Sequence, residues 1–105
     1  MNIAEFMDKF TVEIEEILGP IVPEFLSNRR IDCTLIRRLV GEGNFGEIRR
    51  LGHRMKGTGG SYGFDAISEI GEIIEKAALA ADQDTIHNEV QRLSDYLDRV
   101  LVVYV

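Results

Sequence analysis

Apolar side chains recur at steps of three and four residues along almost the whole chain, and this spacing is the strongest constraint on its fold. Such a repeat places the apolar residues on one face of a helix, where a neighbouring element can bury them. The most regular run lies near the C-terminus and comprises Ile86, Val90, Leu93, Leu97, Val100 and Tyr104. Strand signals are weak, so the sequence predicts an all-α protein built only from helices.

Glycine, proline and short polar turns divide this repeat into segments. Four helices are predicted, at about 21–41, 45–60, 65–81 and 84–103. An apolar stripe near the N-terminus predicts a further helix within residues 2–18. Short turns between amphipathic helices favour antiparallel neighbours. We therefore expect one domain over 1–105: an antiparallel up-and-down four-helix bundle at about 21–103, with an additional N-terminal helical segment at 1–18.

The chain carries a formal net charge of −6, and its charges are unevenly placed. Proteins that bind nucleic acid are usually basic, so we expect no nucleic-acid partner. Basic side chains are nevertheless concentrated in the middle of the chain, at Arg29, Arg30, Arg37, Arg38, Arg49, Arg50, Arg54 and Lys56. An acidic protein with a local basic region suits a small anionic target or an acidic surface on a partner.

The remaining composition excludes several classes of protein. Cys33 is the only cysteine, so no intrachain disulfide can form, and this fits a reducing cytoplasm. The chain has neither a signal-peptide start nor an apolar run near the roughly 20 residues that span a bilayer, so we expect no membrane partner. One cysteine and two separated histidines cannot supply a metal site. We expect a cytoplasmic monomer, and the Met1 start favours a free-standing protein.

The segment predicted as a helix at 45–60 carries the residues that suggest a function. On a helical wheel Ile48, Leu51 and Met55 fall opposite His53, so the imidazole points away from the core. Three glycines and three cations surround His53 on its own face: Gly46, Gly57, Gly60, Arg49, Arg50 and Lys56. His53 is thus predicted to lie on a strip of helix surface that has no other side chains, flanked by positively charged side chains.

The glycines inside this helix need a reason, because each costs about 1 kcal/mol relative to alanine. Gly52 and Gly59 lie toward the core, where close helix packing explains them. Gly57 and Gly60 point the other way, and packing within the bundle does not explain them. The close approach of an external partner does explain them.

The chemistry that fits this strip is attack by a neutral imidazole nitrogen on phosphorus. An exposed imidazole is mostly neutral at cytosolic pH and needs no activating base. The phosphoramidate product is anionic, and Lys56, one turn along, can offset its charge. The sequence has no nucleotide-binding loop and no kinase signature, so the phosphoryl group must come from a partner.

These residues resemble the signature of the histidine phosphotransfer (HPt) domains of bacterial phosphorelays. The match lies in His53-Arg54-Met55-Lys56-Gly57-Thr58, Tyr62-Gly63 and Ile74-Glu75. The resemblance spans about residues 22–103, and the N-terminal segment has no firm counterpart in the family. Gly52 replaces a frequent alanine, and Gly71 stands where a larger small residue is common. Both departures concern packing more than chemistry.

The resemblance implies a four-helix bundle in which His53 is phosphorylated. It implies exchange of the group with an aspartate of response-regulator receiver domains, free or within hybrid histidine kinases. Lys56 would assist electrostatically and Gly57 sterically. No cofactor is expected on this chain, because the receiver in such pathways supplies the Mg²⁺. The residues predicted to form the docking surface are Arg49, Arg50, Arg54, Gly46 and Gly60.

Two functions of different classes remain open. The first is a phosphocarrier without catalytic activity of its own, loaded at His53. The second is a helical adaptor that binds a receiver or kinase without accepting phosphate. His53 separates them, because a pure adaptor would not need it. An autonomous enzyme is a distant third, since no second acid, base or metal site accompanies the histidine.

Overall fold

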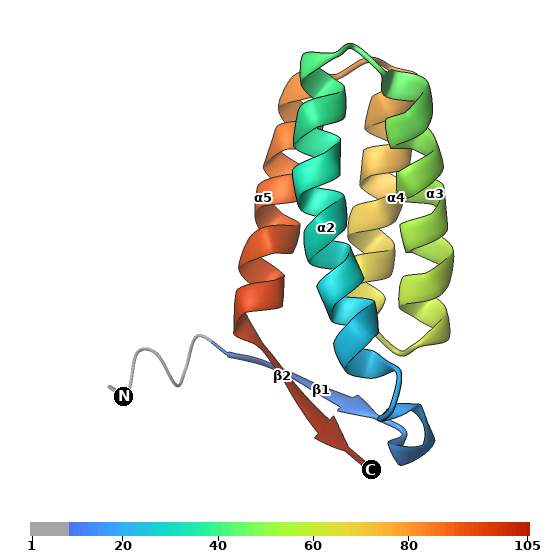
Figure 1. Cartoon of the computed structure of the whole chain (residues 1–105), viewed down its shortest axis with the longest axis vertical. Helices are drawn as coiled ribbons and strands as arrows, with labels where there is room; N and C mark the ends of the chain where they lie inside the picture. Colours follow the sequence, from blue (N-terminus) through green and yellow to red (C-terminus); the bar gives the residue numbers. More distant parts are fainter. Residues whose placement is uncertain (1–8) are drawn as a thin grey trace.

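Four long helices lie side by side in a computed structural model that describes residues 9–105 (Figure 1). They are α2 (Val22–Gly41), α3 (Phe45–Ser61), α4 (Asp65–Leu79) and α5 (Gln83–Arg99). The predicted helical bundle is therefore confirmed. The additional N-terminal helix is not, and a small sheet takes its place at one end of the bundle.

Short turns connect the helices, and their residues explain where each helix starts and stops. Gly43 and Gly63 follow the ends of α2 and α3 and adopt positive φ angles of 68° and 85°, which glycine reaches without a steric penalty. The Asn44 side chain then accepts a hydrogen bond from the backbone N–H of Glu47 at 3.2 Å and caps α3. Asp82 caps α5 in the same way, through the N–H of Thr85.

The hydrophobic core runs between the four helices and uses the apolar stripes that the sequence predicted. Its most deeply buried side chains come from every helix and include Ile36, Ile48, Leu51, Met55, Ile67, Ile70, Ile74, Ile86 and Leu93. Pro23 lies in the first turn of α2, where its missing N–H leaves no hydrogen bond unmade.

The prediction of a helix within residues 2–18 is wrong for the described part of that segment. Residues 1–8 lie outside the described residues. Beyond them the chain forms strand β1 (Phe10–Ile14) and a short 3-10 helix, η1 (Glu16–Leu18). Apolar residues at Phe10, Val12 and Ile14 also fit the two-residue repeat of a strand, and over five residues the two periods cannot be separated.

The C-terminal segment corrects the expectation that the chain contains only helices. Helix α5 ends at Arg99, not near 103, and Val100–Tyr104 forms strand β2, parallel to β1. Val100 and Tyr104 fitted the helical stripe, but β-branched side chains favour extended backbone once a neighbouring strand is present. That strand comes from the opposite end of the chain, so local sequence did not reveal the pairing.

The sheet closes one end of the bundle. Ile14, at the end of β1, is only 2% exposed and belongs to the hydrophobic core. A Cβ atom on Gly63 would lie 3.0 Å from the Cδ1 atom of Ile14, so the turn between α3 and α4 rests on this strand. The ring of Phe10 packs against Tyr96 of α5, with 5.6 Å between ring centroids.

Helices α3 and α4 approach each other closely because glycines line their contact. A Cβ atom on Gly71 would lie 2.5 Å from the backbone nitrogen of Lys56, and one on Gly52 would lie 2.9 Å from the Gly71 carbonyl oxygen. At Gly59 the same atom would meet the backbone of Ser68 at 2.7 Å. The prediction that Gly52 and Gly59 serve close packing is confirmed, and Gly71 shares that role.

Candidate functional site

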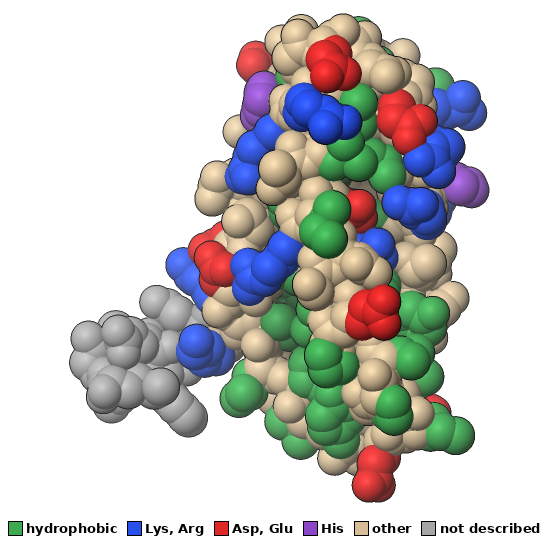
Figure 2. Space-filling model, viewed as in Figure 1, with side chains coloured by type: hydrophobic (Ala, Val, Ile, Leu, Met, Phe, Trp, Pro, Cys, Tyr) green, Lys and Arg blue, Asp and Glu red, His purple; other side chains and the backbone are tan. Residues whose placement is uncertain are grey.

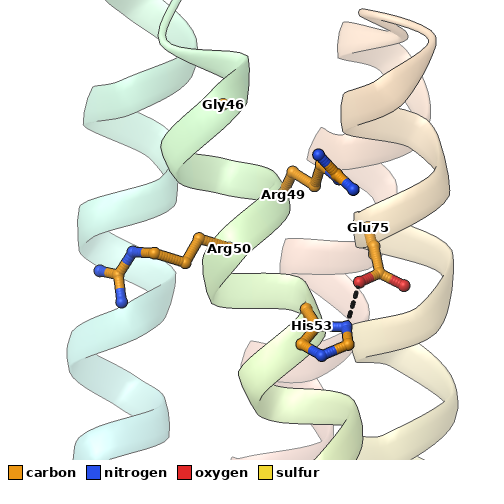
Figure 3. Close-up of a pocket in the computed structure, with 5 residues that line it drawn as sticks. All are labelled: Gly46, Arg49, Arg50, His53 and Glu75. Carbon is orange, nitrogen blue, oxygen red and sulfur yellow. Dashed lines mark hydrogen bonds and ion pairs between the residues drawn. The ribbon is translucent and has the colours of Figure 1, made fainter.

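His53 lies in the middle of α3, with 76% of its side chain exposed. The prediction that it points away from the core is confirmed. Its Nδ1 atom is 2.5 Å from the Oε2 atom of Glu75 on α4 (Figure 3). A carboxylate only accepts hydrogen bonds, so in the neutral ring this contact places the proton on Nδ1 and the lone pair on Nε2. Nε2 lies on the side of the ring turned away from Glu75.

Glu75 is the residue of this site whose role the sequence did not predict. Its side chain is only 17% exposed, beside the buried Ile74. A Cβ atom on Gly52 would lie 2.7 Å from the backbone nitrogen of Glu75, so the missing side chain there lets α4 bring Glu75 against α3. The Ile74-Glu75 pair matched the family signature in the sequence. The contact of Glu75 with His53, however, depends on the spacing between α3 and α4.

A hollow of about 280 Å³ adjoins His53 on the surface of α3. It is lined by Gly46, Arg49, Arg50, His53 and Glu75. Arg49 and His53 project toward α4, whereas Arg50 projects to the opposite side of α3, toward α2 (Figure 3). No atom lies within 4 Å of the position that a Cβ on Gly46 would occupy, so this end of the strip is open.

Lys56 already has an acidic neighbour. Its Nζ atom lies 3.6 Å from the Oε1 atom of Glu72 on α4, and Lys76 reaches the same oxygen at 3.2 Å. The hydrogen bond from Lys76 lowers the pKa of Glu72, and the charge of Lys56 adds to this effect. A phosphoryl group on His53 would therefore compete with Glu72 for the Lys56 ammonium.

The three arginines predicted for docking do not form one cluster. Arg50 makes an ion pair with Glu47 one turn earlier, and this hydrogen bond lowers the pKa of Glu47. Arg54 lies on the α2 side, with its Nη2 atom 4.0 Å from Asp32. Arg49 is on the α4 side of the helix. Within residues 9–105, Arg49 forms no ion pair. The three arginines therefore flank His53 from two directions, Arg49 from the α4 side and the other two from the α2 side.

Arg29, which the sequence placed in the basic middle of the chain, is buried. It forms an ion pair with Asp32 at 2.9 Å, and its Nη1 donates a hydrogen bond to the Oγ1 of Thr58 at 3.3 Å. Burial raises the pKa of Asp32, although the charges of Arg29 and Arg54 oppose that effect. The pair joins α2 to the turn of α3 that follows His53, so it supports the helix and is not a docking cation.

The glycines on the exposed face of α3 differ from one another. A Cβ atom on Gly57 would meet no atom within 4 Å, so Gly57 lies in open space. Gly60 is exposed as well, but its Cβ would make an ordinary contact with Ser68 of α4 at 3.6 Å. The open part of the strip is therefore formed by Gly46 and Gly57, on either side of His53.

A comparison with known protein families matches residues 5–102 to the Hpt domain. The match covers nearly the whole chain, and the protein belongs to this family. Hpt domains carry out histidine phosphotransfer in phosphorelays of two-component signalling, and they are phosphocarrier modules rather than classical enzymes. Their partners are in general response-regulator receivers. The match begins before β1, so it includes strand residues for which the signature offered no counterpart.

The other comparisons and searches gave no match. No curated protein and no solved structure matches the chain. Within residues 9–105, no helix is long and apolar enough to cross a membrane. Over the same residues, no group of histidine, cysteine and acidic side chains is arranged to hold a metal ion.

Proposed function

We propose that this protein is a phosphorelay intermediate that carries a phosphoryl group on Nε2 of His53. It takes the group from an aspartate of one receiver domain, such as that of a hybrid histidine kinase, and donates it to another. The observation that supports this most directly is an exposed imidazole whose Nδ1 is held by a carboxylate. We place the exchange in the cytoplasm and assign it to a single domain over residues 1–105.

The transfer step requires no proton to move. The Nε2 lone pair attacks the phosphorus of the receiver's aspartyl phosphate. The bond from phosphorus to the carboxylate oxygen breaks, and its electron pair leaves with the aspartate. Nδ1 keeps its proton, so the ring becomes cationic, and the nearby Glu75 carboxylate stabilises that charge. In the reverse step the aspartate attacks, and the imidazole leaves as a neutral base.

The residues around His53 have distinct proposed roles. Lys56 turns from Glu72 to the phosphoryl oxygens once the group is on the ring. Gly57 and Gly46 leave room for the receiver's active site, including the Mg²⁺ that the receiver brings. Arg49, Arg50 and Arg54, together with Gly60, form the surrounding docking surface for the acidic receiver. The adaptor alternative gives no reason for the contact between His53 and Glu75.

The experiment that tests this function uses a receiver domain charged with acetyl phosphate. The chain is mixed with the charged receiver, separated from it, and analysed for bound phosphate. We expect phosphate that is labile in acid and stable in base, as a phosphoramidate is. A chain that binds the receiver but never acquires such phosphate would be an adaptor.

Removing the Glu75 carboxylate should slow transfer and release the tautomer of His53. We expect Glu75→Ala to reduce the transfer rate about ten- to a hundredfold, by analogy with carboxylates that orient metal-ligating histidines. The ¹⁵N shifts of the ring should change from a single Nδ1–H tautomer to a mixture. Glu72→Ala is the control for the tautomer, because Glu72 contacts Lys56 and not the ring. An unchanged tautomer in Glu75→Ala would contradict the role given to Glu75.

Reversing one docking charge should slow association with the receiver. Arg50→Glu places an acid beside Glu47 and opposite an acidic partner, so we expect association about three- to tenfold slower at low salt and a smaller effect at high salt. Stopped-flow measurements at two ionic strengths give these rates. Arg37→Glu is the matched control, because Arg37 lies on α2 and donates to Gln91 of α5, away from α3. Equal effects of both variants would place the docking face elsewhere.

A further inference from the structure

The two-stranded sheet exposes apolar side chains at one end of the molecule. Strands β1 and β2 run together across the end of the bundle, below α2 and α5 (Figure 1). Hydrophobic side chains gather over this end of the surface (Figure 2). The large apolar residues exposed on or beside the sheet are Phe10, Ile17, Ile21, Leu101, Val103, Tyr104 and Val105. Such a group on an otherwise charged protein marks a site of association.

The sheet has one covered face and one open face. Val12, Ile14 and Val102 pack against the core of the bundle. Leu101 and Val103 alternate with them and are 49% and 41% exposed. Parallel sheets are normally covered on both faces, and sheets of only two strands are marginal on their own. Within residues 9–105, this sheet therefore lacks a layer or a neighbour that its type usually has.

The outer edge of β2 has no pairing strand among the described residues. Each strand has one neighbour, and within residues 9–105 the backbone of β2 forms hydrogen bonds across strands only with β1 and the residues that follow β1. Strand β2 has the sequence VLVVY, with no charge and no proline. Proteins that keep an edge strand single usually place a charge, a proline or a bulge on it, and β2 has neither of the first two.

We propose that the edge of β2 is a self-association site, at which a second copy of this chain adds its own β2. Two copies related by a two-fold axis pair their β2 strands antiparallel and form a four-stranded sheet with β2 at the centre. Because β2 has no charged side chain, this pairing puts no like charges opposite each other. The sequence predicted a monomer, and this proposal replaces that prediction.

The distribution of charge favours β2 as the seam, that is, as the strand at which the two chains pair. Strand β1 contains Glu13 and is followed by Glu15 and Glu16. A seam through β1 would bring the acids of two chains together, each chain with a net charge of −6. A seam through β2 leaves these acids at the two outer edges of the joined sheet. On the open face, β2 contributes the apolar Leu101 and Val103, and the charged Glu13 lies on β1 beside Val103. The part of this face next to the proposed pairing is therefore uncharged, as a contact between two identical acidic chains requires.

The proposed association leaves the phosphotransfer site accessible. His53 lies eight residues before the end of α3 at Ser61, which corresponds to about 12 Å along the helix axis. The turn that follows α3 touches the sheet, where Gly63 meets Ile14, and His53 lies well before that turn. Two copies joined through β2 would thus present two separate histidines. The inference does not depend on the proposed function, because no step of it uses His53.

The mass of the chain in solution tests this proposal. We expect light scattering or sedimentation to show a mass rising from one chain at about 1 µM toward two chains at about 500 µM, since a short seam gives a weak interface. Leu101→Lys combined with Val103→Lys should keep the chain monomeric throughout. Both side chains face solvent, so circular dichroism should show an unchanged helical content. The matched control is Ile31→Lys on α2, which changes a side chain that is 60% exposed and should leave the association intact.

Hydrogen exchange supplies a second measurement that needs no substitution. The amides of residues 100–104 should exchange more slowly at high than at low concentration of the unaltered chain, while those of α3 should not change. A wild-type chain that stays monomeric overturns the proposal. So does a dimer that persists in the double lysine variant, or exchange in β2 that is independent of concentration. The His53→Gln variant should associate as the unaltered chain does, whatever its phosphotransfer activity.

Discussion

Replacing His53 with glutamine should abolish phosphoryl uptake while leaving the fold and receiver binding nearly unchanged. The side chain is 76% exposed and contributes nothing to the core, so its replacement opens no cavity. A glutamine amide can still donate a hydrogen bond to Glu75, so the Glu75 carboxylate keeps a hydrogen-bond partner on α3. It has no nucleophilic nitrogen, however, so no bond to phosphorus can form.

Three measurements on the same sample separate the possible outcomes. Phosphate transfer from a charged receiver should fall below detection, whereas receiver affinity and the urea midpoint should match those of the unaltered chain. His87→Gln is the control, because His87 is the other histidine and lies exposed near the start of α5. If His53→Gln still acquired acid-labile phosphate, the carrier proposal would be wrong for this residue. If neither variant changed uptake, the acceptor would not be a histidine.

The four helices could be predicted from sequence because each is specified locally. Their apolar stripes, caps and glycine turns lie within the segment that they describe, and α2, α3 and α4 begin and end within two residues of their predicted bounds. The error in α5 begins where local information stops being sufficient. Val100 continues the helical stripe, yet it pairs with Phe10, ninety residues away in the sequence.

The same distinction applies to the candidate site, where features within one helix could be predicted and contacts between two helices could not. A helical wheel uses only one helix, and it placed His53 outward and Gly52 inward correctly. The contact of His53 with Glu75, the pairing of Lys56 with Glu72 and the burial of Arg29 each involve two helices. Their geometry depends on the distance and rotation between those helices. These are consequences of core packing, and no residue pattern within one helix encodes them.

The same substitution at two glycines of α3 should therefore have opposite consequences. At Gly52 a Cβ atom already falls 2.7 Å from the backbone nitrogen of Glu75, and backbone atoms on both helices cannot move aside separately. We expect Gly52→Leu to lower the free energy of unfolding by at least about 3 kcal/mol, at the upper end of overpacking effects. At Gly57 the space is open, and leucine is the better helix former by about 1 kcal/mol. Gly57→Leu should hold or raise stability in urea.

The two substitutions should affect phosphoryl transfer for different reasons. Gly57→Leu keeps the contact between His53 and Glu75, but its side chain stands one turn from the imidazole, where the receiver's aspartyl phosphate must approach. A displacement of about 1 Å from in-line geometry can reduce the rate on the order of a hundredfold, so we expect transfer and receiver affinity to fall together in a stably folded protein. Any transfer lost in Gly52→Leu should instead follow the fraction unfolded, or the separation of Glu75 from the ring, which the ¹⁵N shifts of His53 report. Normal binding and transfer by Gly57→Leu would show that the open strip is not where the partner docks. A stable Gly52→Leu would show that the close approach of α3 and α4 is not what holds Glu75 against His53.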